Sequence, residues 1–401
     1  MRKILKSKWV SLLGATIMLS LLFFVGNYWE NRIGIPDQKE DMFVIGSGFY
    51  GDRKIAIIQY DLDVNKIISQ HEVAIDHEFS SRVSRVQFDP ETGDVFYVSM
   101  SGANPMQTGE CLKYTSDKRC IPARIYKDNV FNEGNDILVY EPENDDFFNW
   151  TYNQKTKKIY TSEYNNQADW YYEINPDTLS KKLISKITLP KGKFQTGDLS
   201  IDNNHIISMY GYDEQSIIEV NYINLSDVGG EIPPVTIKNS SHNEGYISPD
   251  LKKVAFSLWP TKDGFVVYDL LSGSKKKEIL SEIDTRLTNV LPVWAGNRQL
   301  IFLVKEKSGI EKLQSANLNS TKLETLVRND NSLNIVTTSP SGRYAIVESY
   351  ENESQKPIAK YSYFDFQNKV FIPMNEFSEG IRMNNSKRIF PVYFGWDVKK
   401  S

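Results

Sequence analysis

Short apolar runs separated by polar turns repeat along most of the chain, and Glu244–Leu280 shows the repeating unit most clearly. Apolar residues alternate with others along Val254–Leu258 and again along Phe265–Leu270, which is the two-residue period of β-strands. A Ser-Pro-Asp turn ending at Asp250 and a glycine at Gly264 mark the chain reversals between these runs. The pattern predicts a meander of short antiparallel strands, which needs copies of itself on either side to bury its faces.

The unit recurs with a nearly constant period. From Ile159 onward, the strands that follow an equivalent polar turn begin 47, 48, 46, 44 and 45 residues apart. A second marker, expected at the end of each third strand, is an apolar residue, then Asp, Asn or Glu, then an apolar residue or proline. The seven copies are Tyr60–Leu62, Tyr140–Pro142, Ile174–Pro176, Ile223–Leu225, Tyr268–Leu270, Ala316–Leu318 and Phe364–Phe366. A period in the forties is typical of the blades of a β-propeller.

The number of blades follows from the two ends of the repeat region. Eight candidate second strands, counting Phe43–Gly46 and Ile389–Phe394, face seven third-strand markers. In a ring, the last segment can complete the first blade and so remove an open sheet edge. We therefore predict an all-β, seven-bladed β-propeller closed by residues from about Glu379 onward, with eight blades as the alternative.

The N-terminal residues differ in character from the repeats. Residues 1–8 carry four Lys and Arg and no acid, and Trp9–Gly26 is an uncharged apolar stretch of 18 residues. As a helix this stretch would be about 27 Å long, close to the thickness of the hydrocarbon core of a bilayer. We predict a signal anchor or transmembrane helix, with the basic end in the cytoplasm and the rest of the chain outside. A cleaved signal peptide, which would make the protein secreted, is the alternative, although the stretch ends without a good Ala-x-Ala pattern.

These features divide the chain into a membrane helix over residues 1–26, a polar stalk over 27–40 and a propeller over 41–401, with an insertion at about 102–135. Without the four cations of residues 1–8, 43 Lys and Arg face 51 Asp and Glu, a net charge near −8. Nucleic-acid binding requires clustered Lys and Arg, so we expect no such partner. The basic run Lys275–Lys277 is interpreted as part of a solvated outer strand.

The two cysteines, Cys111 and Cys120, lie in the insertion with eight residues between them. Outside the membrane, such a pair is typical of a disulfide that pins a loop, and we predict this disulfide here. Two unpaired thiols are the alternative. A metal site is less favoured because no histidine lies nearby in the sequence.

No set of residues specifies a reaction. The nucleophile-elbow and phosphate-loop motifs are absent, and no metal-ligand spacing relates the four histidines, His71, His77, His205 and His242. The acidic segment Glu141–Asp146 does not match a calcium-binding loop and is interpreted as a surface turn. The aromatic residues between Phe147 and Tyr172 fit packing between blades, with a glycan- or peptide-binding platform as the alternative. We assign no catalytic, cofactor-binding or metal-binding residue and expect no cofactor.

Two blades resemble a known repeat. Ser248–Ser257, followed by Val266–Leu270, resembles the blade motif of TolB-like and WD40-like propellers, and Ser339–Ala345 is a second match. Phe88–Gly93 is similar to the turns of bacterial YVTN-type propellers. The remaining blades depart from the motif, at Asn153, Asp202 and Ala295. The resemblance implies a bacterial extracytoplasmic propeller that binds other proteins or envelope components, and it supplies no catalytic residue.

We predict a membrane-anchored binding or scaffold module. Its partner, a cell-envelope protein or a small ligand, would dock at the mouth of the central channel or on the insertion at 102–135. The alternative is a propeller enzyme of the lyase, lactonase or cyclase class, with its site at the channel. Two carboxylates, or a histidine and a carboxylate, within hydrogen-bond reach around a deep pocket would favour the enzyme.

Overall fold

The computed structural model describes most of the repeat region. The described residues are 40–48, 54–74, 82–101, 121–131, 136–143, 147–164, 168–189, 193–202, 204–212, 215–225, 233–238, 245–258, 263–281, 285–287, 292–320, 322–329, 332–351, 358–380 and 389–398. All of them belong to one compact unit, Glu40–Lys399. The helix predicted over residues 1–26 and both cysteines lie outside them. Within these ranges, no helix has the length and apolar character needed to cross a membrane.

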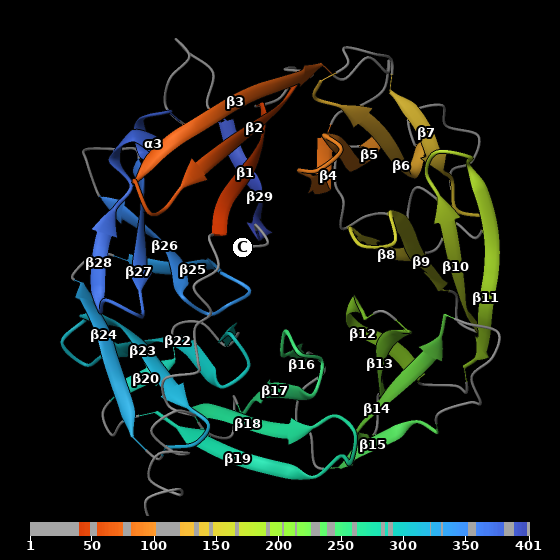
Figure 1. Ribbon diagram of the computed structural model, residues 1–401. Helices are drawn as coiled ribbons and strands as arrows, with labels where there is room; N and C mark the ends of the chain where they lie inside the picture. Colours follow the sequence, from red (N-terminus) through yellow and green to blue (C-terminus); the bar gives the residue numbers. More distant parts are fainter. Residues whose placement is uncertain are drawn as a thin grey trace, which may run out of the picture. The chain divides into compact units, whose positions relative to one another are not determined.

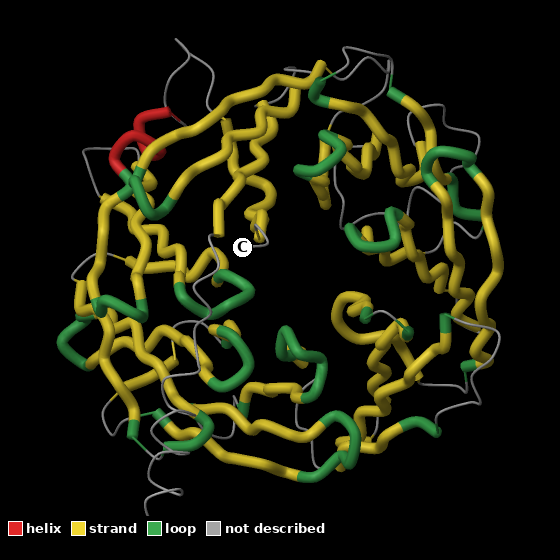
Figure 2. The backbone as a smooth tube through the Cα atoms, in the orientation of Figure 1, coloured by secondary structure: helices red, strands yellow, loops and turns green. Residues whose placement is uncertain are grey.

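Seven antiparallel sheets follow one another around a ring, so this unit is the predicted all-β, seven-bladed propeller (Figure 1). From the innermost to the outermost strand (Figure 2), the first blade consists of β29 (Ile389–Val398), β1 (Glu40–Gly48), β2 (Lys54–Asp61) and β3 (Lys66–Ala74). The second consists of β4 (Arg82–Asp89), β5 (Asp94–Ser101), β6 (Ile121–Asn129) and β7 (Ile137–Tyr140). The third consists of β8 (Phe147–Asn153), β9 (Lys158–Tyr164), β10 (Ala168–Asn175) and β11 (Ser180–Thr188).

The fourth blade consists of β12 (Lys193–Ile201), β13 (His205–Tyr212), β14 (Gln215–Asn224) and β15 (Val235–Lys238). The fifth consists of β16 (Gly245–Ile247), β17 (Lys253–Ser257), β18 (Gly264–Asp269) and β19 (Lys275–Leu280). In the sixth, β20 (Thr285–Leu287) and β21 (Val293–Ala295) both pair with β22 (Gln299–Glu306), which is followed by β23 (Glu311–Asn317) and β24 (Leu323–Asn329). The seventh consists of β25 (Ser332–Thr338), β26 (Tyr344–Glu351), β27 (Ile358–Asp365) and β28 (Val370–Pro373).

The last strand of the chain completes the first blade. Strand β29 pairs antiparallel with β1, from Glu40 opposite Val398 to Gly48 opposite Ile389. The carboxylate of Glu40 also accepts hydrogen bonds from the backbone amide (2.9 Å) and hydroxyl (2.6 Å) of Ser341, which lies in the turn of the seventh blade. The predicted closure by the C-terminal segment is therefore confirmed, and the pairing leaves β1 without a free edge.

Alternating side chains hold neighbouring blades together. In β1, Met42 packs with Tyr344 against the seventh blade, whereas the next residue, Phe43, packs with Tyr97 against the second. Among the described residues, one apolar cluster lies between each pair of neighbouring blades. Four buried aromatic residues of the third blade, Trp150, Tyr152, Tyr160 and Tyr171, belong to these clusters. The two-residue period of each strand thus supplies apolar side chains to two interfaces at once.

Four of the markers predicted at the ends of the third strands cap the turns into the outermost strands through pairs of hydrogen bonds. Asp269, for example, accepts hydrogen bonds from the backbone amides of Leu271 (3.1 Å) and Ser272 (3.0 Å). Equivalent bonds to the amides two and three positions on are made by Asp61, Asn175 and Asp365. Because neighbouring strands run antiparallel, these turns and those between first and second strands emerge on one face of the ring, called here the turn face.

Two elements differ from the prediction. The marker at Tyr140–Pro142 follows the fourth strand of its blade, because Ile121–Asn129, within the range predicted as an insertion, forms the third strand. The proline in Ile121–Asn129 and the mixture of charged and apolar residues there hid the two-residue period of this strand. The short helix α3 (Asn375–Gly380) includes Glu379 and Gly380, which were predicted to begin the closing segment. Only one turn of helix packs Phe377 into the core, which is too short for a helical period to be visible.

Candidate functional site

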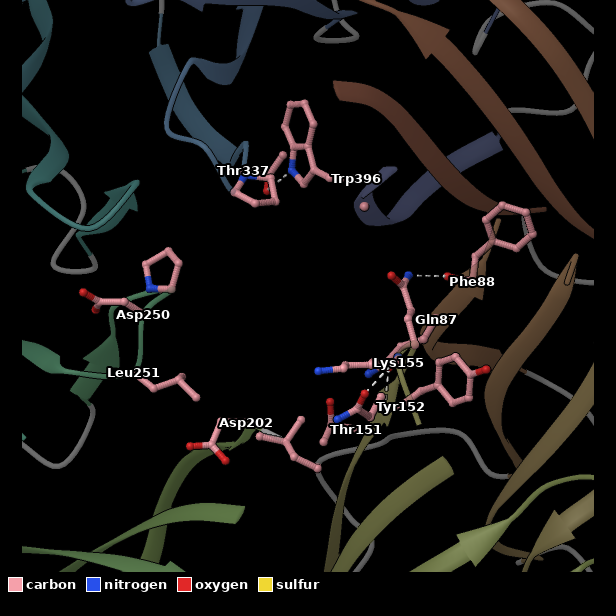
Figure 3. Close-up of a pocket in the computed structure, with 16 residues that line it drawn as sticks. Gln87, Phe88, Thr151, Tyr152, Lys155, Asp202, Asp250, Leu251, Thr337 and Trp396 are labelled. Carbon is pink, nitrogen blue, oxygen red and sulfur yellow. Dashed lines mark hydrogen bonds between the residues drawn. The ribbon is translucent and has the colours of Figure 1, made fainter. Parts of the chain in front are cut away.

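A cavity of about 710 Å³ lies where the turns that follow the innermost strands meet, at the mouth of the central channel (Figure 3). Six of the seven blades contribute lining residues, and the sixth blade is the exception among the described residues. The lining residues with charged, amide or indole side chains include Gln87, Asn153, Lys155, Asp202, Asp250 and Trp396. The cavity is therefore built from short segments that lie far apart in the sequence.

Asp202 contributes a carboxylate from the turn between β12 and β13. Its Oδ1 accepts hydrogen bonds from the backbone amides of Asn204 and His205, both at 2.6 Å. Its Oδ2 lies 3.2 Å from Nδ1 of His205. Burial by itself raises the pKa of Asp202, but these hydrogen bonds outweigh it and hold the pKa below its ordinary value. The carboxylate is thus ionised at neutral pH and bound to its own turn.

Asp250 plays the same part in the fifth blade. Its Oδ1 accepts hydrogen bonds from the hydroxyl of Ser248 (2.6 Å) and the amide of Lys252 (3.2 Å), and its Oδ2 lies 3.3 Å from Nζ of Lys253. Burial again favours a higher pKa, but the bond from Ser248 and the neighbouring lysine lower it overall. The amide of Asp250 donates to Asn297 in the next blade at 2.9 Å, which fixes this turn against its neighbour.

Amide side chains and a lysine form another side of the cavity, between the second and third blades. Oε1 of Gln87 accepts a hydrogen bond from the backbone amide of Tyr152 at 2.7 Å, and Oδ1 of Asn153 accepts one from the amide of Lys155 at 2.9 Å. The exposed side chain of Lys155 extends into the cavity in Figure 3. These hydrogen bonds fix the two amide side chains. For Lys155, by contrast, the bond fixes the backbone of the turn and not the long side chain.

The buried carboxylate of Asp89 binds residues on this side of the cavity. Oδ2 of Asp89 accepts hydrogen bonds from the hydroxyl of Tyr152 and from Nζ of Lys157, both at 2.7 Å. Burial favours a higher pKa for Asp89, but the bonds from Lys157 and Tyr152 dominate and lower it. The ion pair links the turns of two blades, and Lys157 has a left-handed backbone conformation with φ of 55°.

The closing strand supplies an aromatic side. Trp396 in β29 lies partly buried against the core cluster of the first and seventh blades. Its Nε1 donates to Oγ1 of Thr337 at 3.4 Å, so the indole is oriented by the blade next to it. In Figure 3, Trp396, the pair Asp202 and Asp250, and Lys155 lie on separate sides of the cavity.

The criterion that would favour an enzyme is not met at this cavity by the residues that the structure describes. No hydrogen bond joins Asp202 to Asp250, and each carboxylate is bound to its own turn with a lowered pKa. His205 does contact Asp202, but it is not among the residues that line the cavity. A general acid or base works best with a pKa near the working pH.

Cys111 and Cys120 lie outside the described residues, so their disulfide stays a prediction. Over the described ranges, no group of three or more His, Cys, Asp or Glu side chains is arranged to hold a metal ion. The sequence predicted a site at the channel mouth but not the residues that line it. The Ser-Pro-Asp sequence at Asp250 and the Asp-Asn-Asn sequence at Asp202 did identify two of the turns that form the cavity.

No protein-family model matches the sequence, and no curated protein matches it. Solved structures similar in fold include TolB from Acinetobacter baumannii, with 14% identity, a TM-score of 0.38 and coverage of 82% of this chain and 79% of that one. A putative 6-phosphogluconolactonase from Bacteroides uniformis has 11% identity, a TM-score of 0.46 and coverage of 90% and 99%. A prolyl endopeptidase has 10% identity and a TM-score of 0.46; the match covers 81% of this chain but only 47% of that one. At these identities the likeness concerns the fold alone, and TolB, the propeller that the repeats resemble, is among them.

Proposed function

We propose that this protein is an extracytoplasmic binding module, anchored in the membrane by residues 9–26, and that the cavity at the channel mouth is its ligand-binding site. The observation that carries the proposal is the way in which the polar lining is held. Gln87, Asn153, Asp202 and Asp250 are all fixed by hydrogen bonds within the free protein. A site arranged in advance loses little conformational entropy when a ligand binds.

The lining also indicates the kind of ligand. Two residues with ionised carboxylates, a lysine and a tryptophan line one cavity, and its volume of about 710 Å³ lies in the usual range for small-ligand sites. A polar ligand with one flat face would place that face on Trp396 and its hydrogen-bonding groups toward the acidic and amide sides. A small molecule and a single projecting segment of an envelope protein both satisfy this description.

Filling the cavity tests the site. Lys155→Trp places a bulky side chain in the cavity from an exposed position, so the fold should be unaffected. Lys252→Trp is the matched control, because Lys252 is an exposed turn lysine on the same face that does not line the cavity. Native mass spectrometry of the full chain, purified from its own membranes in mild detergent, should find a bound mass in the wild type and in K252W but not in K155W. A bound mass that persists in K155W, or none in the wild type, contradicts the proposal.

The anchor is tested separately. The full chain should stay in the membrane fraction after washing with alkaline carbonate, and protease added to intact spheroplasts should digest the propeller. A chain without residues 1–26 should be absent from that fraction. Release of the full chain by carbonate would refute the anchor without affecting the cavity.

A further inference from the structure

The turn face carries exposed apolar side chains around its outer edge. In five blades, one large apolar side chain with a high exposed fraction lies in the turn between the third and fourth strands or, in the seventh blade, at the first residue of the fourth strand. These residues, called here the apolar rim, are Val64 (60%), Phe131 (63%), Leu179 (50%), Leu271 (68%) and Val370 (41%). Single exposed apolar residues are common on protein surfaces, but here they recur in or beside the equivalent turn of five blades, at differing positions, and all on one face.

The turns do not require apolar residues at these positions. Capping side chains, such as Asp269 and Asp61, accept hydrogen bonds from backbone amides of the turns, and the apolar side chains make none of these bonds. Leu179 is the clearest case, because it combines half exposure to water with a left-handed backbone, φ 57°. Asn or Gly would be more stable in that conformation. The turn geometry sets this backbone conformation, as at Asn65 and Lys369, but neither it nor the exposure favours a leucine here.

The chain enters the propeller on the same face. Glu40 is the first residue of β1 and pairs with Val398 at the end of β29, so both ends of the described chain lie at the level of the turns. The 13 residues between Gly26 and Glu40 connect this face with the apolar stretch Trp9–Gly26. Fully extended, this connection would span at most about 50 Å.

We propose that the turn face rests on the outer surface of the membrane, with the apolar rim inserted among the lipid headgroups and the channel-mouth cavity turned toward the bilayer. A bilayer is the partner that a flat ring of separated apolar side chains fits, because each side chain can enter the interface independently. A protein partner would instead be expected to bury one contiguous patch. This inference rests on the proposed membrane anchor, and it implies that the ligand of the cavity is a polar group presented at the membrane surface.

Site-specific fluorescence tests the orientation. An environment-sensitive fluorescent amino acid is placed by amber suppression at position 64, 179 or 271 of the full chain, which is then reconstituted in phosphatidylethanolamine and phosphatidylglycerol vesicles that contain a doxyl-labelled lipid. Positions 280 and 350 are the controls, because Leu280 (47%) and Tyr350 (37%) are also exposed but lie toward the opposite ends of their strands. The rim labels should shift to the blue and be quenched, and the control labels should do neither.

Equal quenching at both sets of positions, or quenching of the controls alone, overturns the orientation. Flotation of the same vesicles separates this result from failure of the anchor: a chain that floats with unquenched rim labels refutes only the rim contact, whereas a chain that does not float refutes both. Rim labels that shift only after an envelope protein extract is added would identify a protein partner and also overturn the proposal. As a second measurement, L179D/L271D should weaken quenching at position 64, and L280D should leave it unchanged.

Discussion

The pKa of aspartate is shifted in opposite directions at two kinds of position in this propeller, and the neighbouring groups determine the direction. At the channel mouth, Asp202 and Asp250 accept hydrogen bonds from backbone amides and have lowered pKa values. Between the third and fourth blades, Asp169 is wholly buried, and its Oδ2 accepts hydrogen bonds from Tyr171 (2.8 Å) and Tyr210 (2.6 Å). Its Oδ1 has no hydrogen-bond partner in the described structure. Burial therefore dominates and raises the pKa of Asp169 to about 6.

This residue should make the propeller less stable as the pH rises. The folded state binds the Asp169 proton more tightly than the unfolded state, so the contribution to stability is complete below about pH 4 and is lost between about pH 4 and 6. Asp169→Asn keeps an acceptor for both tyrosines and cannot ionise, so relative to wild type it should gain about 2 to 3 kcal/mol between pH 4 and 8. Urea unfolding at several pH values measures the difference. Glu91→Gln, at an exposed carboxylate, should follow the wild type, and parallel curves for D169N would contradict the assignment.

Backbone strain at Leu179 gives a second prediction at the same scale. Because φ is 57° there, Leu179→Asn should stabilise the propeller by about 0.5 to 1 kcal/mol. The same change at Leu183, which is also exposed but extended within β11, should destabilise it, because Asn is unfavourable in strands. Chemical denaturation of both variants decides the matter. A loss of stability in L179N would show that the leucine makes an intramolecular contact worth more than the strain.

Strand β29 is the element on which the ring and the cavity both depend. It removes the open edge of β1 and places Trp396 at the channel mouth. Its partner strand is tied to the seventh blade through Glu40 and Ser341, which are 301 positions apart in the sequence. The pair of strands β1 and β29 therefore closes the ring.

Ending the chain at Arg388 removes β29 and so leaves the ring open. The truncated protein should expose the edge of β1, lose cooperativity in thermal unfolding and aggregate, because open edges pair with one another. A synthetic peptide with the sequence Lys387–Ser401, added during refolding, should restore the unfolding midpoint, and a scrambled peptide should not. A truncated chain that stays monomeric with an unchanged midpoint would mean that β29 is dispensable.

The connection between β5 and β6 should tolerate removal, in contrast to β6 itself. Ser101 pairs with Ile121, so the residues between them can be replaced by a short Gly-Ser turn without changing the strand register. This variant, which lacks Cys111 and Cys120, should keep the fold and the midpoint of the wild type in reducing buffer. Deletion of the whole range 102–135 should unfold the second blade, because it removes β6. Circular dichroism during heating distinguishes the two, and equal behaviour would contradict the assigned strand order.

At the scale of the molecule, the periodic part of the architecture could be predicted from the sequence and the site could not. The two-residue alternation, the period near 46 and the Asp or Asn caps such as Asp269 specify sheets, their number and their closure, because each is a local pattern. Strand β6 and helix α3 could not be predicted because neither has a clear period of apolar residues. The cavity escaped because residues such as Gln87, Asp202 and Trp396 meet only after six blades are arranged in a ring.

The central claim is that the channel mouth is where this protein binds its ligand, and in-cell photo-crosslinking tests it most directly. A photoreactive amino acid is introduced at position 155, inside the cavity, or at position 252, outside it on the same face. After irradiation of living cells, mass spectrometry of the purified chain should find one defined adduct at position 155 and none at position 252. Adducts at both positions, or at neither, would contradict the claim.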